Sequence, residues 1–364
     1  MAKTLADAKY EVHVLEWDRD ANLKEFEIKD NISVHRFRHR ASYGMSLIYL
    51  LPLWWLFIAR TCLTNRFHVI QPQNLDNLLP VWFLRPVKGF KIVYALADFY
   101  SDAYIPLTYP FLRSSIRFVE LSLIKTVTAT ILVDEARIAQ IGFQPRGLTV
   151  IYNSPPDMCH ELLLTENTIT ESYDSFNVFY AGGISEAQGV YLLADACQNT
   201  SGVTLKVAGF GNQEKHFVNY VRTKKSILFL GRIPYEQVLN LAMKCDCIVV
   251  LYDPKVPNMV YASPNKLFEA MMCGKPVIVS AGTAMAKKVM NENCGLVINS
   301  GSIVELEKAL NLLKGDRGLS LSLGLNGRKA YLEKYDWRLM EKRIVTLYNS
   351  LIFHSHRANK LKAT

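Results

Sequence analysis

The chain has 364 residues, of which 50% are hydrophobic and 21% are charged, and this length and composition predict a folded protein of two domains. Its formal net charge of +9 favours an anionic partner such as a membrane surface, a phosphorylated ligand or nucleic acid, and a basic surface without such a partner is the alternative. Because no zinc-finger, RNP or helix-turn-helix pattern accompanies the charge, we expect no nucleic-acid binding.

The first residues, MAKTLADAKYE, are polar and helix-forming, unlike the apolar core of a signal peptide. The seven cysteines form no Cys-x-x-Cys pair, so free thiols in a reducing compartment are the simplest interpretation. We therefore expect a cytoplasmic protein, with peripheral attachment to the cytoplasmic membrane face as an open alternative.

The most apolar run extends over residues 45–59 and is too short to span a bilayer. A buried core helix is the favoured interpretation. The alternative is an in-plane contact with an anionic membrane through residues 36–60. The basic run RFRHR precedes the apolar run and Arg60 ends it. Trp54 and Trp55 are also residue types that favour the membrane interface.

Short apolar segments alternate with helix-length segments along the chain. In the first half the expected strands are residues 10–15, 32–37, 68–71, 91–95, 129–134 and 148–153. A polar stretch with prolines and acidic residues, 154–175, is the best linker candidate. In the second half the expected strands are residues 176–182, 204–209, 226–231, 247–252, 276–280 and 295–298.

Strands that alternate with helices indicate parallel sheets covered by helices on both faces. Because the pattern stops at the linker and restarts after it, we expect two doubly wound, Rossmann-like α/β domains, residues 1–153 and 176–335. Residues 336–364 would form a closing helix and a basic tail, which we expect to be disordered.

Glycines follow three successive strands of the expected second domain. They are Gly182 and Gly183 after the first strand, Gly209 and Gly211 after the second, and Gly231, which precedes Arg232 and Ile233, after the third. Ligands of doubly wound sheets bind beyond the carboxyl ends of the strands, and glycine lets the backbone approach a phosphate closely. One such turn is a weak signal, but three in order predict a ligand site.

The segment SPNKLFEAMMCGKPVIVS predicts a short helix that leads into a buried strand. Ser263 suits the N-cap, Pro264 the first helical position and Gly274 the left-handed C′ position. Lys266 and Glu269 lie three residues apart on one face of this helix. They form either a ligand-binding pair or an exposed i,i+3 pair of opposite charge.

This series of motifs resembles the C-terminal domain of the family-four retaining glycosyltransferases. The resemblance covers most of residues 176–350 through AGFG (208–211), GRIPYEQV (231–238), KLFEAMMCGKPVIVS (266–280) and the closing YDW (335–337). In the first half only the strand spacing and IYNSP match. The resemblance implies the two-domain GT-B fold, with a cleft between the domains and a nucleotide-sugar donor bound by the second.

The resemblance also implies individual roles. Glu269 would accept hydrogen bonds from the ribose hydroxyls, Lys266 would place a positive charge at the diphosphate, and no metal or other cofactor is expected. The start of the helix would face the diphosphate with its amides and positive dipole end. The remaining donor-binding residues that it implies are Ser263, Pro264, Asn265, Gly182, Gly183, Gly211 and the backbone of Arg232 and Ile233.

The chain departs from the family's pattern at several positions. Tyr261 stands where the family has a first glutamate, which touches the transferred sugar. Gly183 and Gln188 stand where it has cationic phosphate ligands, so Gln188 could donate only neutral hydrogen bonds. The family's active-site histidine falls near Ala97. Asp98 beside it is either the catalytic contact to sugar or acceptor, or the cap of the next helix.

The N-terminal region differs most. A family N-domain begins with a strand, a glycine-rich loop and a helix, whereas this chain opens at the helix. We therefore expect that one central strand, within a unit of roughly 15–30 residues, is missing, which would leave its neighbours with unpaired backbone groups.

The sequence thus predicts a metal-independent, retaining glycosyltransferase that moves a sugar from a nucleotide-sugar to a glycan or lipid-linked acceptor. The first alternative is a non-catalytic or truncated glycosyltransferase-like protein that still binds the nucleotide-sugar. The second is a nucleotide-sugar epimerase, which would need more acid–base residues than the motifs provide.

Overall fold

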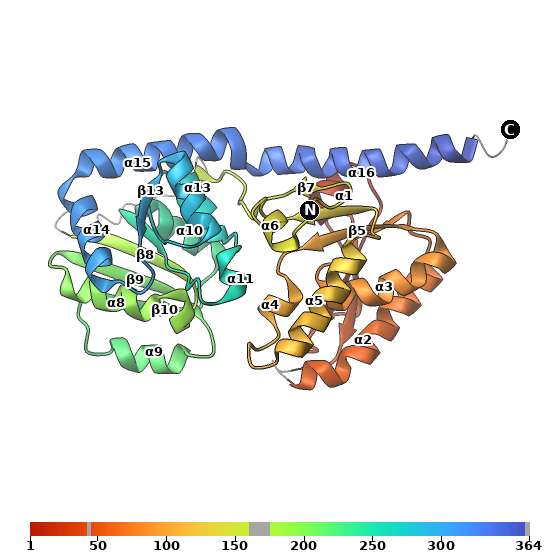
Figure 1. Ribbon diagram of the computed structural model, residues 1–364, viewed down its shortest axis with the longest axis horizontal. Helices are drawn as coiled ribbons and strands as arrows, with labels where there is room; N and C mark the ends of the chain where they lie inside the picture. The colour runs from red at the N-terminus through yellow and green to blue at the C-terminus, as the bar shows by residue number, and fades with distance from the viewer. Residues whose placement is uncertain (42–44, 160–174, 361–364) are drawn as a thin grey trace. The chain divides into compact units, whose positions relative to one another are not determined.

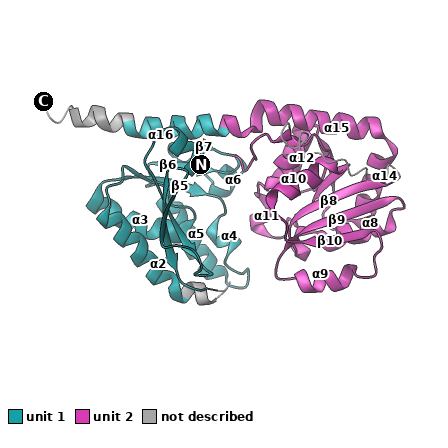
Figure 2. Ribbon diagram, turned by 180° about the vertical axis from the view of Figure 1, so that it is seen from behind, with its two compact units in different colours: residues 1–151, 340–364 teal, residues 152–339 magenta. Residues whose placement is uncertain are grey.

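The computed structural model describes residues 1–41, 45–159 and 175–360. The chain divides into two compact α/β units (Figure 2). Unit 1 comprises residues 1–151 and 340–364, and unit 2 comprises residues 152–339. Residues 160–174, which make up most of the expected linker, lie outside the described residues.

Unit 1 alternates strands and helices (Figure 1). Its strands are β1 (Val12–Asp18), β2 (Phe26–Lys29), β3 (Ile32–Arg38), β4 (Val69–Ile70), β5 (Lys91–Leu96), β6 (Ala129–Leu132) and β7 (Thr149–Val150). Its helices are α1 (Ala2–Asp7), α2 (Met45–Thr64), α3 (Leu75–Lys88), α4 (Tyr100–Ala103), α5 (Pro110–Ile124) and α6 (Arg137–Ile141). The strands form two sheets, in the orders β1-β3-β2 and β4-β5-β6-β7, rather than the single expected sheet.

β2 is a described strand of unit 1 that the sequence did not predict. It pairs antiparallel with β3, whereas every other strand pair of this unit is parallel in the described residues. Asp30 and Asn31, which join the two strands, both have positive φ values, 51° and 60°. Such a two-residue turn is typical of tight hairpins, because its twist matches that of the strands.

Helices α2, α3 and α5 pack on the face of β5 that presents Ile92, Tyr94 and Leu96. Trp54 of α2 belongs to this core, and its indole Nε1 donates a 2.7 Å hydrogen bond to Asn77 Oδ1. The inner face of α2 is thus a core face, as the favoured interpretation of this apolar run required. The expectation that Trp54 marks a membrane interface is wrong, because its ring is buried and its N–H is satisfied inside the unit.

The outer face of α2 exposes large apolar side chains at Tyr49, Leu53, Leu56 and Leu63. Trp55 is half-buried and donates to the carbonyl oxygen of Asp76 at 2.8 Å, so it too is held within the unit. Arg36, the first residue of the expected basic run, is buried and paired with Glu16 and Glu27. It therefore adds no surface charge. Within the described residues, no helix combines the length and the apolarity needed to cross a membrane.

Unit 2 contains one parallel sheet with helices on both faces (Figure 1). Its strands are β8 (Phe176–Gly183), β9 (Val203–Phe210), β10 (Ile227–Gly231), β11 (Cys247–Val250), β12 (Val277–Ser280) and β13 (Gly295–Ile298). Its helices are α8 (Val190–Asn199), α9 (Glu214–Val221), α10 (Tyr235–Lys244), α11 (Pro257–Val260), α12 (Asn265–Met272), α13 (Ala284–Glu292), α14 (Ile303–Gly315) and α15 (Arg317–Ala330). The order β10-β9-β8-β11-β12-β13 is that of a doubly wound sheet, and all six expected strands form.

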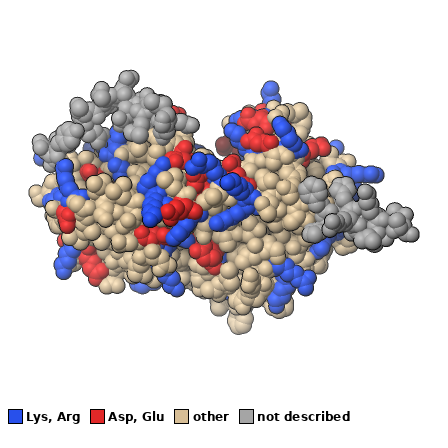
Figure 3. Space-filling model, turned by 90° about the horizontal axis from the view of Figure 1, so that it is seen from above, with Lys and Arg blue, Asp and Glu red and all other residues tan. Residues whose placement is uncertain are grey.

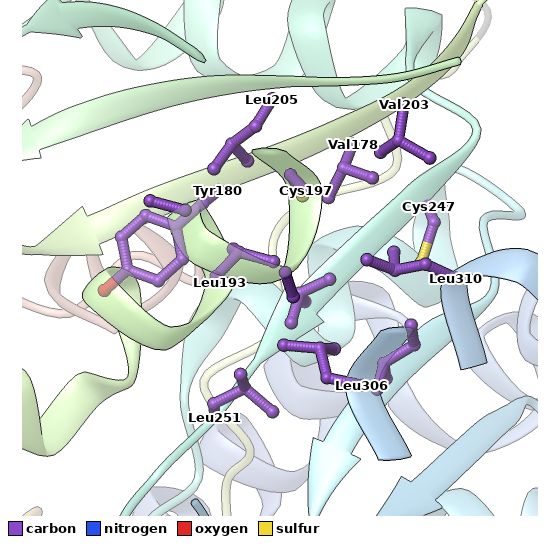
Figure 4. Close-up of a cluster of buried hydrophobic side chains, with 14 of the residues drawn as sticks. Val178, Tyr180, Leu193, Cys197, Val203, Leu205, Cys247, Leu251, Leu306 and Leu310 are labelled. Atoms are coloured by element: carbon purple, nitrogen blue, oxygen red, sulfur yellow. The ribbon is translucent and has the colours of Figure 1, made fainter. Parts of the chain in front are cut away.

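The core of unit 2 lies on both faces of this sheet. On one face, alternate residues of the strands pack against α8 and α14, as Figure 4 shows for Val178 and Leu205 against Leu193, Leu306 and Leu310. All five side chains are buried. Strands buried on both faces read as continuous apolar runs, which explains why the sequence located them well.

Two expectations, for the linker and for the C-terminal tail, are wrong. Residues 154–159, expected to be linker, pack on unit 2, where Asp157 forms a 2.7 Å ion pair with Arg328. The closing helix α16 (Trp337–Lys360) continues through most of the tail that we expected to be disordered. This part of the tail contains no glycine or proline to end a helix. All seven cysteines are free, as predicted.

Candidate functional site

The carboxyl ends of β8 and β11 flank the point where the strand order of unit 2 reverses, and the first turn of α12 lies beside them. A Cβ atom on Gly182, at the end of β8, would lie only 2.8 Å from Lys266 Nζ of α12. The same Nζ lies 4.1 Å from the ring centroid of Tyr180 and 5.4 Å from that of Tyr252. The expected glycine turn and the expected helix therefore meet around one amine.

Lys266 is the unusual residue of this site. Its side chain is 6% exposed, and Nζ has no hydrogen-bond partner among the described residues. Burial lowers the pKa of Lys266 to about 7, and the nearby carboxylate of Glu269 opposes this shift. A buried amine without a hydrogen-bond acceptor is unfavourable, because the contacts with the two tyrosine rings do not replace the hydrogen bonds that it loses from water. An anionic ligand at this position would supply the missing partner.

Glu269 lies one turn further along α12 and is 5% exposed. Its Oε1 accepts a 2.9 Å hydrogen bond from the hydroxyl of Tyr235, the first residue of α10. Burial raises the pKa of the Glu269 carboxyl, while the Tyr235 hydrogen bond and Lys266 oppose the shift. The alternative of an exposed i,i+3 pair is wrong, because both charged side chains are buried. The structure therefore places Lys266 and Glu269 at the glycine-rich strand ends.

Gln188 also reaches the site, from a short 3-10 turn (Glu186–Gln188) that follows β8. Its Oε1 lies 3.0 Å from the hydroxyl of Tyr180, and that hydroxyl lies 2.6 Å from the carbonyl oxygen of Gly183. A Cβ on Gly183 would lie 2.6 Å from Gln188 Nε2. The amide group of Gln188 is thus held against the end of β8.

The second glycine turn packs directly on the first. A Cβ on Gly209 would lie 1.9 Å from the carbonyl oxygen of Gly182, and a Cβ on Gly211 would lie 2.9 Å from that of Ile184. Real side chains cannot approach backbone atoms so closely, so both positions require glycine. The close approach of β8 and β9 is therefore one reason why these turns contain glycine, besides any approach to a ligand.

The third turn places Arg232 and Ile233 after β10. Arg232 is exposed, and its guanidinium lies 4.7 Å from the ring centroid of Phe210, at the end of the neighbouring strand β9. Ile233 is half-buried and packs against the core of unit 2. Gly231 has φ 65°, a left-handed conformation that favours glycine. These strand ends thus offer an exposed stacking surface that the sequence did not predict.

The start of α12 differs slightly from the prediction. Its N-cap is Pro264, with an extended ψ of 141° and no side-chain cap, so the expected Ser263 cap is wrong. Ser263 is buried, and its carbonyl oxygen accepts a hydrogen bond from Asn153 Nδ2. Asn265 is the exposed first residue of the helix. Tyr261, at the end of α11, is half-buried and has no hydrogen bond to the charged residues of α12 within the described chain.

Asp98 lies in unit 1, two residues beyond the end of β5. Its Oδ1 accepts from Arg137 Nη2 at 3.1 Å, and Arg137 is 1% exposed. The helix that follows, α4, has Phe99 as its N-cap and no side-chain cap. The alternative that Asp98 caps this helix is therefore wrong. The carboxylate is instead held by a buried guanidinium at the carboxyl edge of a parallel sheet, where ligands bind.

Sequence reasoning missed the polar network around Asp98. Arg137 Nη1 donates to Gln140 Oε1 at 2.9 Å, and Gln140 Nε2 donates to Asp102 Oδ2 at 2.7 Å. Asp102 also pairs with Arg113 at 2.8 Å. Asp98 follows β5, Asp102 lies in α4, Arg113 in α5, and the other two in α6, so sequence spacing joins only Arg137 to Gln140. The missed tyrosines of unit 2, Tyr180 and Tyr235, carried a weak signal, because each stands beside a predicted motif.

The site of unit 2 can bind an anion and a diol together. The first amides of α12 and the Lys266 ammonium attract negative charge, and the Glu269 carboxylate accepts hydrogen bonds from hydroxyl groups. Across the parts of the chain that are described, no three His, Cys, Asp or Glu side chains lie together as a metal site.

Comparison with known proteins agrees with this chemistry. Residues 167–330 match the family described as Glycosyl transferases group 1. A putative glycosyltransferase of Bacillus subtilis, YtcC, is 27% identical over 189 residues, which cover 48% of this chain and 45% of that protein. The chain thus matches less than half the length of this relative.

Solved structures give the fold. Sucrose-phosphate synthase from Thermosynechococcus elongatus superposes with a TM-score of 0.79 at 18% identity, over 97% of this chain and 92% of that one. HepE from Anabaena, solved in complex with UDP, gives a TM-score of 0.68 at 18% identity, over 88% of this chain and 87% of that one. Together with the doubly wound sheet of unit 2, these likenesses identify the GT-B fold.

Proposed function

We propose that this chain, which carries a group 1 glycosyltransferase domain in residues 167–330, transfers a sugar from a nucleotide-sugar to a glycan or lipid-linked acceptor. Unit 2 would bind the donor and unit 1 the acceptor. The observation that carries the proposal is the buried Lys266 amine, which has no hydrogen-bond partner among the described residues and lies beside Gly182 at the carboxyl edge of the unit 2 sheet. A donor diphosphate supplies both the charge and the acceptor oxygens that this amine lacks.

Each part of a nucleotide-sugar would contact a chemically complementary group of unit 2. The diphosphate would lie against Lys266, the first amides of α12 and the end of β8 at Gly182 and Gly183. The ribose diol would donate to Glu269. The nucleobase would meet the backbone of Arg232 and Ile233. UDP is the probe of choice, because the structural relative HepE binds it.

We further propose that transfer proceeds with retention and without a metal ion. Negative charge develops on the leaving nucleoside diphosphate in the transition state, and preorganised donors lower the barrier most where charge develops. Lys266, the α12 amides and Gln188 are such donors. Retention is inferred from the family resemblance, and its test is the anomeric configuration of the product by NMR.

Asp98 is the candidate contact to the acceptor or the transferred sugar in unit 1. The Arg137 ion pair holds its carboxylate at the edge of the sheet, where it can accept a hydrogen bond from a hydroxyl group. The net charge of +9 and the exposed outer face of α2 support a place at an anionic membrane, on the cytoplasmic side, for a chain that uses a lipid-linked acceptor.

Isothermal calorimetry with UDP and UDP-glucose tests the donor site. We expect binding by the wild-type chain and a loss of about tenfold or more in the Lys266→Met variant, since a charge-assisted contact is worth roughly 1.5–3 kcal/mol. Lys287→Met, which removes an exposed lysine of α13, is the matched control and should bind normally. Equal affinities for all three proteins would contradict the proposed donor site.

A second candidate, a non-catalytic protein that binds the nucleotide-sugar, is favoured by Tyr261 at the position of a sugar-binding glutamate. A turnover assay distinguishes the enzyme from the non-catalytic protein. Release of UDP from UDP-sugars in the presence of glycan or lipid-linked acceptors supports the enzyme. Tight binding without any release, across donors and acceptors, supports the non-catalytic protein.

A further inference from the structure

Three helices of unit 1 carry an exposed apolar surface that the donor site does not use. α2 packs on α3, and α3 reaches the end of α5, where Trp82 Nε1 and Arg85 Nη1 donate to Thr126. All three helices bury their inner faces in the core on β5. We call their solvent side, together with the loop of residues 104–109, the outer helical face of unit 1.

The outer helical face exposes large apolar side chains in every one of its parts. Phe111 and Phe118 of α5 are 89% and 72% exposed, and Val87 of α3 is 74% exposed. The remaining exposed members are Tyr49, Leu53, Leu56, Leu63, Phe83, Tyr104, Leu107, Tyr109, Leu112 and Val119. Single exposed apolar residues are ordinary, but a gathering of this size marks an interaction surface.

The charges of the same region have one sign at the surface. Its helices and loop contain two acidic residues, Asp76 and Glu120, which are half-buried and buried. Arg60 of α2 is exposed, and so are Arg66 and Lys125, which follow the ends of α2 and α5. The face that carries α15 and α16 is different, since basic and acidic side chains are interspersed on it (Figure 3). An occupant of the outer helical face therefore meets apolar groups and positive charge.

We propose that the outer helical face of unit 1 docks the chain on an anionic lipid bilayer, with Leu107, Phe111 and Phe118 inserted among the acyl chains. An anionic bilayer offers both chemistries of this face, an apolar interior and a negatively charged surface. A second copy of the chain would present the same positive charges and would repel them. The inference rests on the proposed function only in the choice of a lipid-linked acceptor.

This surface differs from the one that the sequence predicted. Of the expected contact, residues 36–60, Arg36, Trp54 and Trp55 are held inside unit 1. Arg38, Arg40 and the outer residues of α2 remain exposed. The contribution of α3 and α5 comes from helices that the sequence did not single out, because their apolar residues read equally well as core.

Vesicle co-sedimentation of the full chain tests the proposal. The wild-type chain should bind vesicles of phosphatidylcholine mixed with phosphatidylglycerol, and should bind pure phosphatidylcholine more weakly. The double variant Phe111→Ser/Phe118→Ser should bind the mixed vesicles about tenfold or more weakly, because it removes two inserted rings. Leu321→Ser/Leu325→Ser, which alters two exposed leucines of α15, is the matched control and should bind like the wild type.

Unchanged vesicle binding by Phe111→Ser/Phe118→Ser would overturn the proposal. So would a stable dimer in sedimentation velocity that this variant dissolves, because the occupant would then be a second copy. The affinity for UDP, measured in the same samples, separates this inference from the proposed function. Vesicle binding that depends on Phe111 and Phe118 in a chain that fails to bind UDP supports the docking face and contradicts the donor site.

Discussion

The hydroxyl of Tyr235 donates a 2.9 Å hydrogen bond to Oε1 of Glu269, so a residue of α10 orients the carboxylate of α12. The motif that follows β10 and the motif that follows β11 are thereby joined in one site. Burial raises the pKa of both groups, since the charged form of each would lose its hydration. The contact keeps the carboxylate in one orientation while its other oxygen remains for a ligand.

Removing this contact should weaken recognition of the ribose. We expect Tyr235→Phe to lower the affinity for UDP by about 3- to 10-fold, because one neutral-to-charged hydrogen bond is lost. The loss should be smaller for 2′-deoxy-UDP, which lacks one of the hydroxyls that Glu269 would accept. Calorimetry with both nucleotides measures the difference. Tyr220→Phe is the control, because Tyr220 also donates to a carboxylate, Asp195, away from the site. An equal loss of affinity for both nucleotides would show that Tyr235 does not contribute to ribose recognition.

Donor affinity should depend on pH through Lys266. Burial lowers its pKa to about 7, so only part of the amine is protonated in the free protein at neutral pH. A bound diphosphate favours the ammonium and raises this pKa, so the affinity should increase as pH falls from about 9 towards 7 and level off below it. UDP-glucose is the suitable ligand, because its diphosphate diester does not titrate in this range. Calorimetry in buffers of different ionisation enthalpy should show proton uptake, and Lys266→Met should abolish it.

The same lysine should destabilise the free chain. The unfolded state, with an ordinary lysine pKa near 10.5, binds more protons than the folded state between about pH 7 and 10.5. The contribution of Lys266 to stability therefore improves as pH rises through this window. We expect Lys266→Met to raise the free energy of unfolding by about 1–3 kcal/mol at pH 7, with a smaller gain at pH 9. Urea denaturation at both pH values checks this, and a less stable variant at pH 7 would contradict it.

The packing of the two glycine turns gives a prediction that is independent of any ligand. Gly209→Ala would place its methyl carbon 1.9 Å from the carbonyl oxygen of Gly182, so β8 and β9 would have to separate. We expect a loss of about 3 kcal/mol or more in the free energy of unfolding, in the range of severe overpacking. Gly315→Ala at the end of α14 is the control, because no atom lies within 4 Å of its added methyl. Similar thermal midpoints for both variants would contradict the close approach.

The sequence predicted unit 2 much better than unit 1, and the reason is physical. Strands such as β11 and β12 are buried on both faces, and β12 directly follows Pro276, so they are visible as apolar runs in the sequence. The positions of Lys266 and Glu269 followed from helix spacing. Their burial did not, because it depends on Tyr180, Tyr252 and Tyr235, which come from other elements. Trp54 shows another limit of the sequence. Its apolar helix could be recognised, but the apolar pattern does not show which side of that helix packs on the core.

The hydrogen-bond network around Asp98 could not be predicted from the sequence either, because its residues come from different elements. Arg137 and Gln140 lie three residues apart on α6, and the pairing of β5 with β6 brings them to Asp98. A buried guanidinium is unfavourable to desolvate, and burial lowers the pKa of Arg137. Its planar fork nevertheless contacts both Asp98 and Gln140, which a lysine ammonium cannot reproduce with the same geometry. We infer that Arg137 is a positioning residue for Asp98.

Substitution of this pair should separate transfer from donor binding. Asp98→Asn keeps the shape but loses the charge, and we expect kcat for transfer to fall by about 10- to 100-fold with little change in UDP affinity. Arg137→Lys should lower kcat by about tenfold, since the carboxylate is no longer fixed. Arg146→Lys, at an exposed arginine before β7, is the control. Steady-state kinetics and calorimetry on the same proteins check the outcome. Full activity of Arg137→Lys would show that Asp98 needs no such support, and a parallel fall in UDP affinity would point to general loss of structure rather than to acceptor chemistry.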